Sequence, residues 1–164
     1  MRAPIPYDYL PPVPAFALTS ESMADGGRVA DEQVYDRGNV SPQLSWSGYP
    51  AQTLSFAVTC FDPDAPTGSG WWHWLVFNLP ADVTSLAAGA ALPAGAVTSR
   101  NDYAEYGYGG PNPPHGPAHR YVFAVHALDT ARLDLDPDAP AAQVGGSIRR
   151  HTIARAVLTA EFGY

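Results

Sequence analysis

The chain has 164 residues, of which 15% are charged, and a formal net charge of −7. This length predicts one domain with a substantial core, because domains usually contain roughly 100 to 200 residues. The acidic balance argues against nucleic acid and anionic membranes as partners, since both attract patches of Lys and Arg. The 17 prolines and 15 glycines predict short strands joined by many turns.

Cysteine content and hydropathy bear on the compartment. Cys60 is the single cysteine, so no disulfide can form within the chain. The first residues lack the apolar run of a secretory signal, and no apolar run approaches the roughly 18 residues of a membrane span. We therefore expect a cytoplasmic protein that does not insert into membranes.

Residues 1–14 contain five prolines. Proline continues neither a helix nor a central strand, so this segment is predicted to be an extended arm draped over a single domain of residues 15–164. The domain is expected to open with a strand over 15–20, a turn at 25–27 and a weaker extended segment over 28–35.

The main strands are predicted over residues 54–61, 71–79 and 119–128, after a short strand that begins at 43–46. Alternation of apolar residues supports each of them, and the last two are apolar on both faces, as central strands are. Strict alternation along 71–79 assigns one set of side chains to a common face: Trp71, His73, Leu75 and Phe77. A second set shares a face along 119–128: His119, Tyr121, Phe123, Val125 and Ala127.

Two segments complete the expected architecture. Residues 87–118 form a long irregular loop, of a length that usually serves function or covers a site. Residues 147–156 contain an N-capping serine, helix formers and basic residues, which predict a helix, and 157–162 resembles a final strand. The pattern predicts a mostly β protein with one helical segment near the C-terminus.

The run 60–66 brings two carboxylates to the end of an apolar strand. Asp62 and Asp64 are two residues apart, so extended geometry projects them to the same side, where they are expected to share a pocket. A structural turn is the alternative, because Asp and Pro also build turns. The same pentapeptide recurs at 136–140, where we interpret it as a loop before the helix.

Imidazole, guanidinium and phenol groups begin two other apolar segments. His73 lies between tryptophans, and His119 precedes Arg120 and Tyr121. A histidine near a carboxylate can donate to an anionic ligand, although strand histidines and tyrosines are more often structural. Arg120 is expected on the opposite face, paired with a carboxylate or carbonyl. Together with Asp62, these residues predict one pocket.

Two other site chemistries have less support. Asp62, Asp64, His73 and His119 include ligand types of a metal site, but no close His-x-His spacing occurs. A nucleophilic hydrolase lacks its Gly-x-Ser-x-Gly motif, and Cys60 falls within a predicted strand. We expect no metal, no cofactor and no catalytic residue.

Taken in order, five motifs resemble those of the phosphatidylethanolamine-binding protein family. They are Ser41–Trp46, Asp62–Pro66, Trp72–Asn78, Gly109–Pro111 and Gly116–Tyr121. The resemblance runs from about Phe16 to Tyr164 and points to the bacterial and archaeal branch, called Raf-kinase-inhibitor-like. It implies a β-sandwich of a larger and a smaller antiparallel sheet, with one or two helices near the C-terminus.

The resemblance maps the family's anion pocket onto Asp62, Asp64, His73, His119 and Tyr121, and the neighbouring loop onto Gly110 and Pro111, which gives seven candidate ligand-binding residues. In the family this pocket takes phosphate-like anions and the phosphoethanolamine headgroup. Tyr121 and a protonated His119 or His73 would donate to phosphate oxygens, while Asp62 or Asp64 would orient the imidazole or accept the ammonium. Many prokaryotic relatives carry Cys where this chain has Asn112, so a thiol-dependent role at that position is excluded.

Three functions follow from these patterns. The first is a module that binds phosphate-like anions or phosphoethanolamine-type small molecules. The second is a kinase- or protease-inhibitor-like module that binds a protein partner, as eukaryotic members of the family do. The third is a hydrolase that uses the Asp/His pocket. We expect the first, without enzymatic activity, and the resemblance adds a homodimer as the expected assembly.

Overall fold

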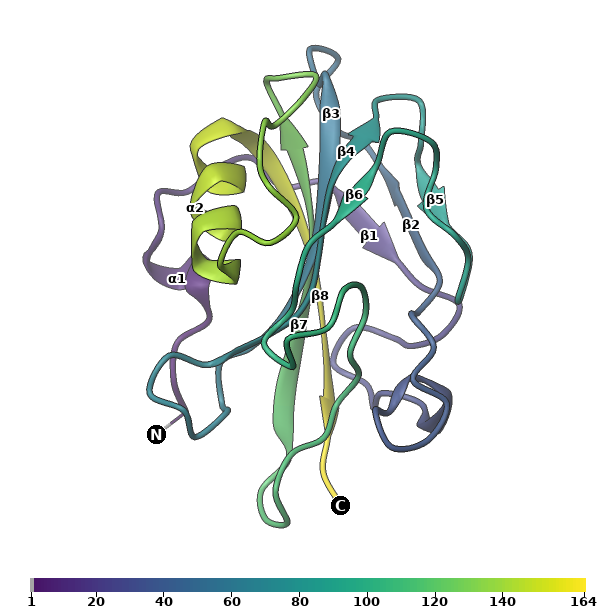
Figure 1. Cartoon of the computed structure of the whole chain (residues 1–164), viewed down its shortest axis with the longest axis vertical. Coiled ribbons are helices and arrows are strands. Elements are labelled where there is room, and N and C mark those ends of the chain that lie inside the picture. Colours follow the sequence, from purple (N-terminus) through teal and green to yellow (C-terminus); the bar gives the residue numbers. More distant parts are fainter. Residues whose placement is uncertain (1) are drawn as a thin grey trace.

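Two antiparallel sheets and a helical layer make up the computed structural model, which describes residues 2–164 (Figure 1). The larger sheet has the strand order β6 (Val97–Thr98), β4 (Trp71–Pro80), β3 (Ser55–Asp62), β7 (His119–Leu128) and β8 (Thr152–Phe162). The smaller sheet has the order β1 (Ala17–Thr19), β2 (Leu44–Ser47) and β5 (Ser85–Leu86). The helical elements are α1 (Pro6–Tyr9), the 3₁₀ turn η1 (Asp31–Gln33) and α2 (Ala141–His151). The predicted fold class is confirmed.

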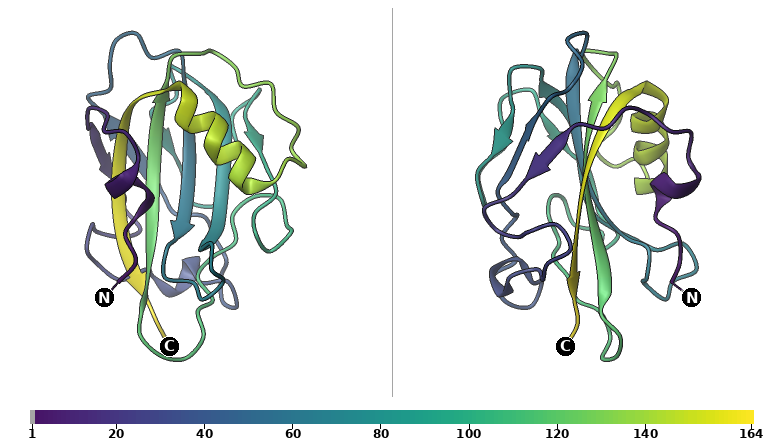
Figure 2. Two further views of the ribbon diagram at one scale, coloured as in Figure 1. Left: turned by 90° about the vertical axis from the view of Figure 1, so that its left-hand side faces the viewer. Right: turned by 180° about the vertical axis from the view of Figure 1, so that it is seen from behind.

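The larger sheet is covered on both faces. Its inner face packs against the smaller sheet through side chains such as Phe56 and Phe123, which are fully buried. Its outer face packs against α2, which lies across the strands, through Leu75, Phe77 and Ile148 (Figure 2). Burying one such side chain stabilises the fold by about 1.5–3 kcal/mol, so the three layers fix the strand ends that carry the site.

Strand β4 departs from strict alternation. Its register against β3 shifts by one residue at two places. Phe56 pairs with Leu79 but Val58 pairs with Val76, and Cys60 pairs with Trp74 but Phe61 pairs with Trp72. Each slip adds one residue to β4, as a β-bulge does. The bulges lie at two places on the strand, near Asn78 and at His73.

The bulge at His73 changes which side chains share a face. Trp72 packs with Leu75 and Phe77 on the helix side of the sheet, whereas the ring of His73 contacts Tyr121, which belongs to the core between the sheets. The prediction that His73 shares a face with Leu75 and Phe77 is therefore wrong. A bulge redirects a side chain in this way, and here it turns the imidazole toward the beginning of β7.

The terminal helix lies earlier in the chain than predicted. It begins after Pro140 and ends at His151, and β8 starts at Thr152, so the prediction of a helix over 147–156 is wrong by several residues at both ends. Gly145 and Gly146 disfavour helix and concealed its first turns. Its basic last turn complements the negative end of the helix dipole.

Two N-terminal predictions also need correction. The arm is not extended throughout, because Pro6–Tyr9 form the helix α1 on the same side of the larger sheet as α2 (Figure 2). Proline is tolerated there because it occupies the first helical position. The extended segment predicted over 28–35 contains η1 instead. Neither α-helix within residues 2–164 is long and apolar enough to cross a membrane.

Candidate functional site

A pocket of about 220 Å³ opens where β3 ends and where β4 and β7 begin. Strand ends from the larger sheet supply its polar groups, and the loop of residues 101–118 forms its opposite wall. Six lining side chains carry the argument: Asp62, Trp71, His73, Tyr103, His119 and Tyr121. Four of the seven predicted site residues therefore meet in one cavity, namely Asp62, His73, His119 and Tyr121.

Asp62 and His119 form a buried pair. Nδ1 of His119 lies 2.7 Å from Oδ2 of Asp62, and a carboxylate oxygen accepts, so Nδ1 carries the proton and donates. Nε2 is the ring nitrogen left for a ligand. Burial raises the pKa of the Asp62 carboxyl, and the hydrogen bond and charge of His119 oppose that rise.

His73 plays a different part from His119. Its Nδ1–H donates to the carbonyl oxygen of Gly109 at 2.7 Å, and its ring meets that of Tyr121 edge to face, with 5.1 Å between the ring centroids. Burial lowers the pKa of His73 to about 4, against the effect of the Gly109 hydrogen bond. The imidazole is therefore neutral near pH 7, and the hypothesis of a protonated His73 is wrong.

Two residues that line the pocket carry buried hydrogen-bond donors without a partner. Within residues 2–164 five buried side-chain atoms lack a hydrogen bond, and two of them are the Tyr121 hydroxyl and the Trp71 indole nitrogen. Leaving a buried donor unpaired costs about 1–3 kcal/mol. Burial also raises the pKa of Tyr121 strongly, so its hydroxyl keeps its proton. Both groups therefore have unused hydrogen-bonding capacity next to the cavity.

Asp64 does not join this pocket. The chain turns after Asp62, whose Oδ1 accepts from the backbone N–H of Asp64 at 2.8 Å, as in an Asx turn. The Asp64 carboxylate then takes two hydrogen bonds from the Arg120 guanidinium, at 2.7 and 2.8 Å. The prediction that Asp62 and Asp64 share a pocket is wrong, while the predicted carboxylate partner of Arg120 is confirmed.

The Arg120 pair fixes the charge of Asp64. Burial alone would raise the pKa of Asp64, but the hydrogen bonds and the positive charge of Arg120 outweigh burial and lower it. Asp64 is therefore an anion whose hydrogen-bonding capacity is largely used. Asp64 therefore does not serve as the ammonium acceptor, a role that was predicted for either Asp62 or Asp64.

Gly110 and Pro111 support the loop that forms one wall of the pocket, without lining the cavity themselves. The Gly110 carbonyl accepts from the Tyr103 hydroxyl at 2.9 Å, and a Cβ on Gly110 would lie 1.9 Å from the carbonyl oxygen of Gln33. The Pro111 carbonyl accepts a backbone hydrogen bond at 2.9 Å. Neither residue lines the cavity, but their neighbour Asn112 does.

Sequence reasoning missed several lining residues. Trp71 was read only as a strand residue, and Tyr103, Asn112 and Pro114 lay in the irregular loop over 87–118. That loop was predicted to cover a site, and three of its residues line this pocket. The only available signal for Tyr103 was an aromatic residue within a polar, glycine-rich segment.

Comparison with known proteins shows the family of the chain. Residues 19–163 match the family model described as "Phosphatidylethanolamine-binding protein". The chain belongs to the phosphatidylethanolamine-binding protein (PEBP) family. The match covers every strand of the larger sheet and the segments that line the pocket, and it leaves α1 outside.

Relatives come from bacteria and archaea. UPF0098 protein YbhB of Escherichia coli is 48% identical over 155 residues, which cover 88% of this chain and 98% of YbhB. A UPF0098 protein of Methanothermobacter thermautotrophicus is 41% identical, over 86% of this chain and 94% of its own. The family and its prokaryotic branch, predicted from five motifs, are confirmed.

Solved structures show the same fold. The crystal structure of E. coli YbcL, described as a new member of the mammalian PEBP family, superposes with a TM-score of 0.88 at 43% identity, covering 91% of this chain and 98% of YbcL. The PEBP homologue CT736 of Chlamydia trachomatis gives a TM-score of 0.81 at 32% identity, with 92% and 98% covered.

Proposed function

We propose that this protein binds small phosphorylated molecules, with a phosphate or phosphoethanolamine-type head, in the pocket between Asp62, His119 and Tyr121. The observation that carries the proposal is a pair of unpartnered buried donors, the Tyr121 hydroxyl and the Trp71 indole N–H, on two residues that line one cavity. Buried donors without acceptors are rare in folded proteins. A phosphate, which presents several strong acceptor oxygens, would satisfy both.

His119 supplies the third donor. Its Nδ1–H donates to Asp62, so a proton shared between the imidazole and a phosphate oxygen would lie at Nε2. Charge-assisted hydrogen bonds from an imidazolium to phosphate are roughly twice as strong as neutral ones. In this arrangement Nε2 of His119, the Tyr121 hydroxyl and the Trp71 indole N–H would bind phosphate oxygens, and His73 stays neutral beside Tyr121.

The size and walls of the pocket favour a headgroup-sized ligand. A volume of about 220 Å³ is below the range of roughly 300–1,000 Å³ for drug-sized ligands. The rings of Trp71 and Tyr103 meet edge to face at 5.3 Å between centroids, and such rings attract an ammonium group by cation–π interaction. A zwitterionic head meets both kinds of group.

We propose binding without turnover. Cys60, two residues before Asp62, is fully buried, and burial raises the pKa of its thiol well above the usual range, so it is not an activated nucleophile. The hydroxyl of Thr67, which lines the pocket, donates to the carbonyl oxygen of Gly70. Neither group is poised to attack a phosphate ester.

The test is to titrate inorganic phosphate into wild type and Tyr121→Phe and to follow backbone amide chemical shifts. Tyr121→Phe removes one oxygen and should weaken binding at least fivefold without unfolding the protein. Tyr49→Phe, the same chemical change in a residue outside the pocket, is the control and should bind as wild type does. Equal affinity in all three proteins would remove the phenol from the site and defeat the proposal.

A further inference from the structure

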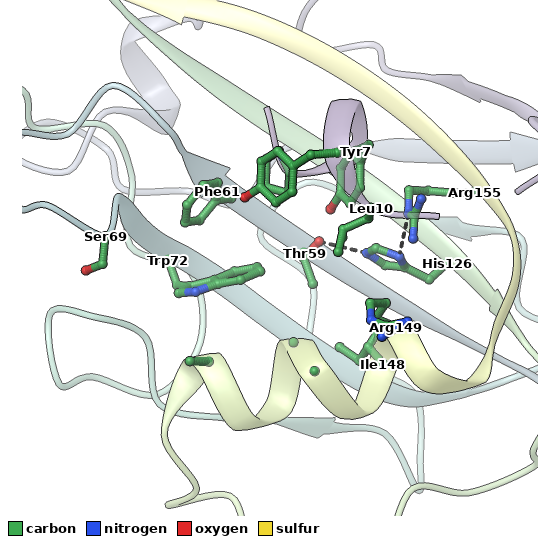
Figure 3. Close-up of a pocket in the computed structure, with 15 residues that line it drawn as sticks. Tyr7, Leu10, Thr59, Phe61, Ser69, Trp72, His126, Ile148, Arg149 and Arg155 are labelled. Carbon is green, nitrogen blue, oxygen red and sulfur yellow. Dashed lines mark hydrogen bonds between the residues drawn. The ribbon is translucent and has the colours of Figure 1, made fainter. Parts of the chain in front are cut away.

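A second pocket lies on the other face of the larger sheet, beneath the two helices. Its volume is about 340 Å³, and its floor is the outer face of β3, β4, β7 and β8. Figure 3 shows α2 along one side and Tyr7 and Leu10 of the N-terminal segment on the other. This volume falls within the usual range for small-molecule sites, roughly 300–1,000 Å³.

The cation Arg155 lies at one end of this pocket. Arg155 is only 7% exposed, and no carboxylate within residues 2–164 forms an ion pair with it. Its Nε–H donates to Nδ1 of His126 at 3.2 Å, and the ring of Tyr7 lies 4.2 Å from the guanidinium. A buried charge without a counterion is costly.

The neighbours of Arg155 do not neutralise it. His126 accepts from Arg155 through Nδ1, so its Nε2–H donates to Oγ1 of Thr59 at 2.9 Å. Burial and the charge of Arg155 lower the pKa of His126 to about 3, so the imidazole is neutral. Arg149, which also lines the pocket, adds a second positive charge at the rim. The positive charge at this end of the pocket would therefore be stabilised by an anion.

The other end of the pocket is apolar. Phe61 and Trp72 lie together there, with 4.7 Å between ring centroids, and Leu10 and Ile148 face the space between the two ends (Figure 3). This division into a cationic end and an aromatic end matches a ligand with an anionic head and an apolar body.

A glycine in helix α2 leaves space for the cavity, because it has no side chain to fill it. Gly146 lies in the middle of the helix, where glycine is roughly 1 kcal/mol less favourable than alanine. A Cβ added there would meet no atom within 4 Å, so packing does not require glycine at this position. Gly146 lines the pocket, and the missing side chain maintains its volume.

The N-terminal segment completes the site. Pro6, Tyr7, Tyr9 and Leu10 line the pocket and precede residue 19, where the match to the PEBP family begins. The pocket is thus formed by a segment outside the family match together with the family fold, and it lies on the opposite face of the sheet from the core that surrounds Tyr121.

We propose that this pocket binds a small amphipathic monocarboxylate, whose carboxylate pairs with Arg155 and whose apolar body packs against Phe61 and Trp72. The planar guanidinium suits a carboxylate, because it can donate two parallel hydrogen bonds. The proposal is independent of the phosphate site, since no residue lines both pockets.

Calorimetric titration with octanoate tests the proposal. Octan-1-ol, which has the apolar body without the carboxylate, and acetate, which has the carboxylate without the apolar body, are titrated for comparison. Wild type should bind octanoate at least tenfold more tightly than either. Arg155→Met should reduce octanoate affinity at least tenfold, and Arg132→Met, the same change at an exposed arginine, should leave it unchanged. Octanoate binding no tighter than octan-1-ol would overturn the proposal.

Gly146→Leu keeps the experiment decisive if Arg155→Met fails to fold. This substitution fills the cavity from α2 with a better helix former and should abolish octanoate binding in a folded protein. Phosphate affinity measured in the same variant should equal that of wild type, which separates this site from the first. Wild-type octanoate affinity in folded Gly146→Leu would place the ligand elsewhere and contradict the proposal.

Discussion

Nδ1 of His119, the first residue of β7, lies 2.7 Å from Oδ2 of Asp62, the last residue of β3. The two strands are antiparallel neighbours, so the ends that carry this pair meet at one end of the sheet. The pair holds the imidazole in one tautomer and leaves the other ring nitrogen for a ligand. Sheet topology thus brings two residues 57 positions apart into one buried pair, which we propose binds the anion.

Asp62→Asn should weaken phosphate binding about tenfold, equivalent to about 1.4 kcal/mol. Asparagine has nearly the same shape, but its amide oxygen is uncharged and holds the His119 Nδ1–H by a weaker hydrogen bond. Phosphate titration at constant ionic strength measures this difference. A variant that binds phosphate as tightly as wild type would show that the Asp62 charge is not used.

Asp64→Ala should destabilise the fold and spare the site. The Asp64–Arg120 pair is mostly buried, and removal of one partner leaves the guanidinium unpaired, at a cost on the order of 1–3 kcal/mol in the free energy of unfolding. Because the folded-state pKa of Asp64 is lowered, its stabilisation is present above about pH 4 and is lost as pH falls through the folded pKa.

Urea denaturation at pH 7 and phosphate titration measure the two effects of Asp64→Ala separately. Phosphate affinity within twofold of wild type is expected. A large loss of affinity with an unchanged free energy of unfolding would instead return Asp64 to the binding site.

Two buried histidines should make stability depend on pH. Burial lowers the pKa of His73 to about 4 and that of His126 to about 3, from about 6.5 in an unfolded chain. Below pH 6.5 the unfolded state therefore binds protons that the folded state does not bind. As pH falls, each histidine lowers the free energy of unfolding by up to about 1.4 kcal/mol per pH unit.

Urea denaturation between pH 7 and pH 4.5 measures that slope. His126→Gln removes one of the two groups, so the free energy of unfolding should fall less steeply in this variant by up to about 1.4 kcal/mol per pH unit. The comparison cancels titrations shared by both proteins, including that of Asp62. Parallel pH profiles for the two proteins would show that His126 is not buried in its neutral form.

Gly146→Ala should raise stability by about 1 kcal/mol, because alanine is favoured over glycine within a helix and the new methyl group meets no atom within 4 Å. For a domain of this size the midpoint of thermal unfolding should rise by roughly 2–4 °C. Gly145→Ala is the contrasting variant, since its Cβ would press on the ring of Trp72 at 3.0 Å, so it should gain less. A lower melting temperature for Gly146→Ala would show that the space is not open.

The main strands and the family were predictable from sequence because they rest on local patterns. Period-two alternation predicted β3 and β7, and five short motifs together predicted the family. The motif before Tyr121 predicted both His119 in the pocket and Arg120 on the other face, because alternate strand residues point to opposite faces.

The remaining features depend on contacts between distant segments. The bulge at His73 is set by register against β3, which no pattern within β4 reveals, and it moved His73 to the opposite face. Asp64 was misplaced because the chain turns before it and Arg120 captures its carboxylate. The second pocket could not be predicted because α1 and α2 come to lie on its two sides only in the folded protein.

The measurement that tests the central claim most directly is a calorimetric titration of phosphoethanolamine into wild type and His119→Ala. Wild type should show saturable binding with a dissociation constant between about 1 μM and 1 mM, that is, about −8 to −4 kcal/mol, and the variant should bind at least tenfold more weakly. Absence of saturable binding to wild type, or equal affinity in the two proteins, would contradict the account.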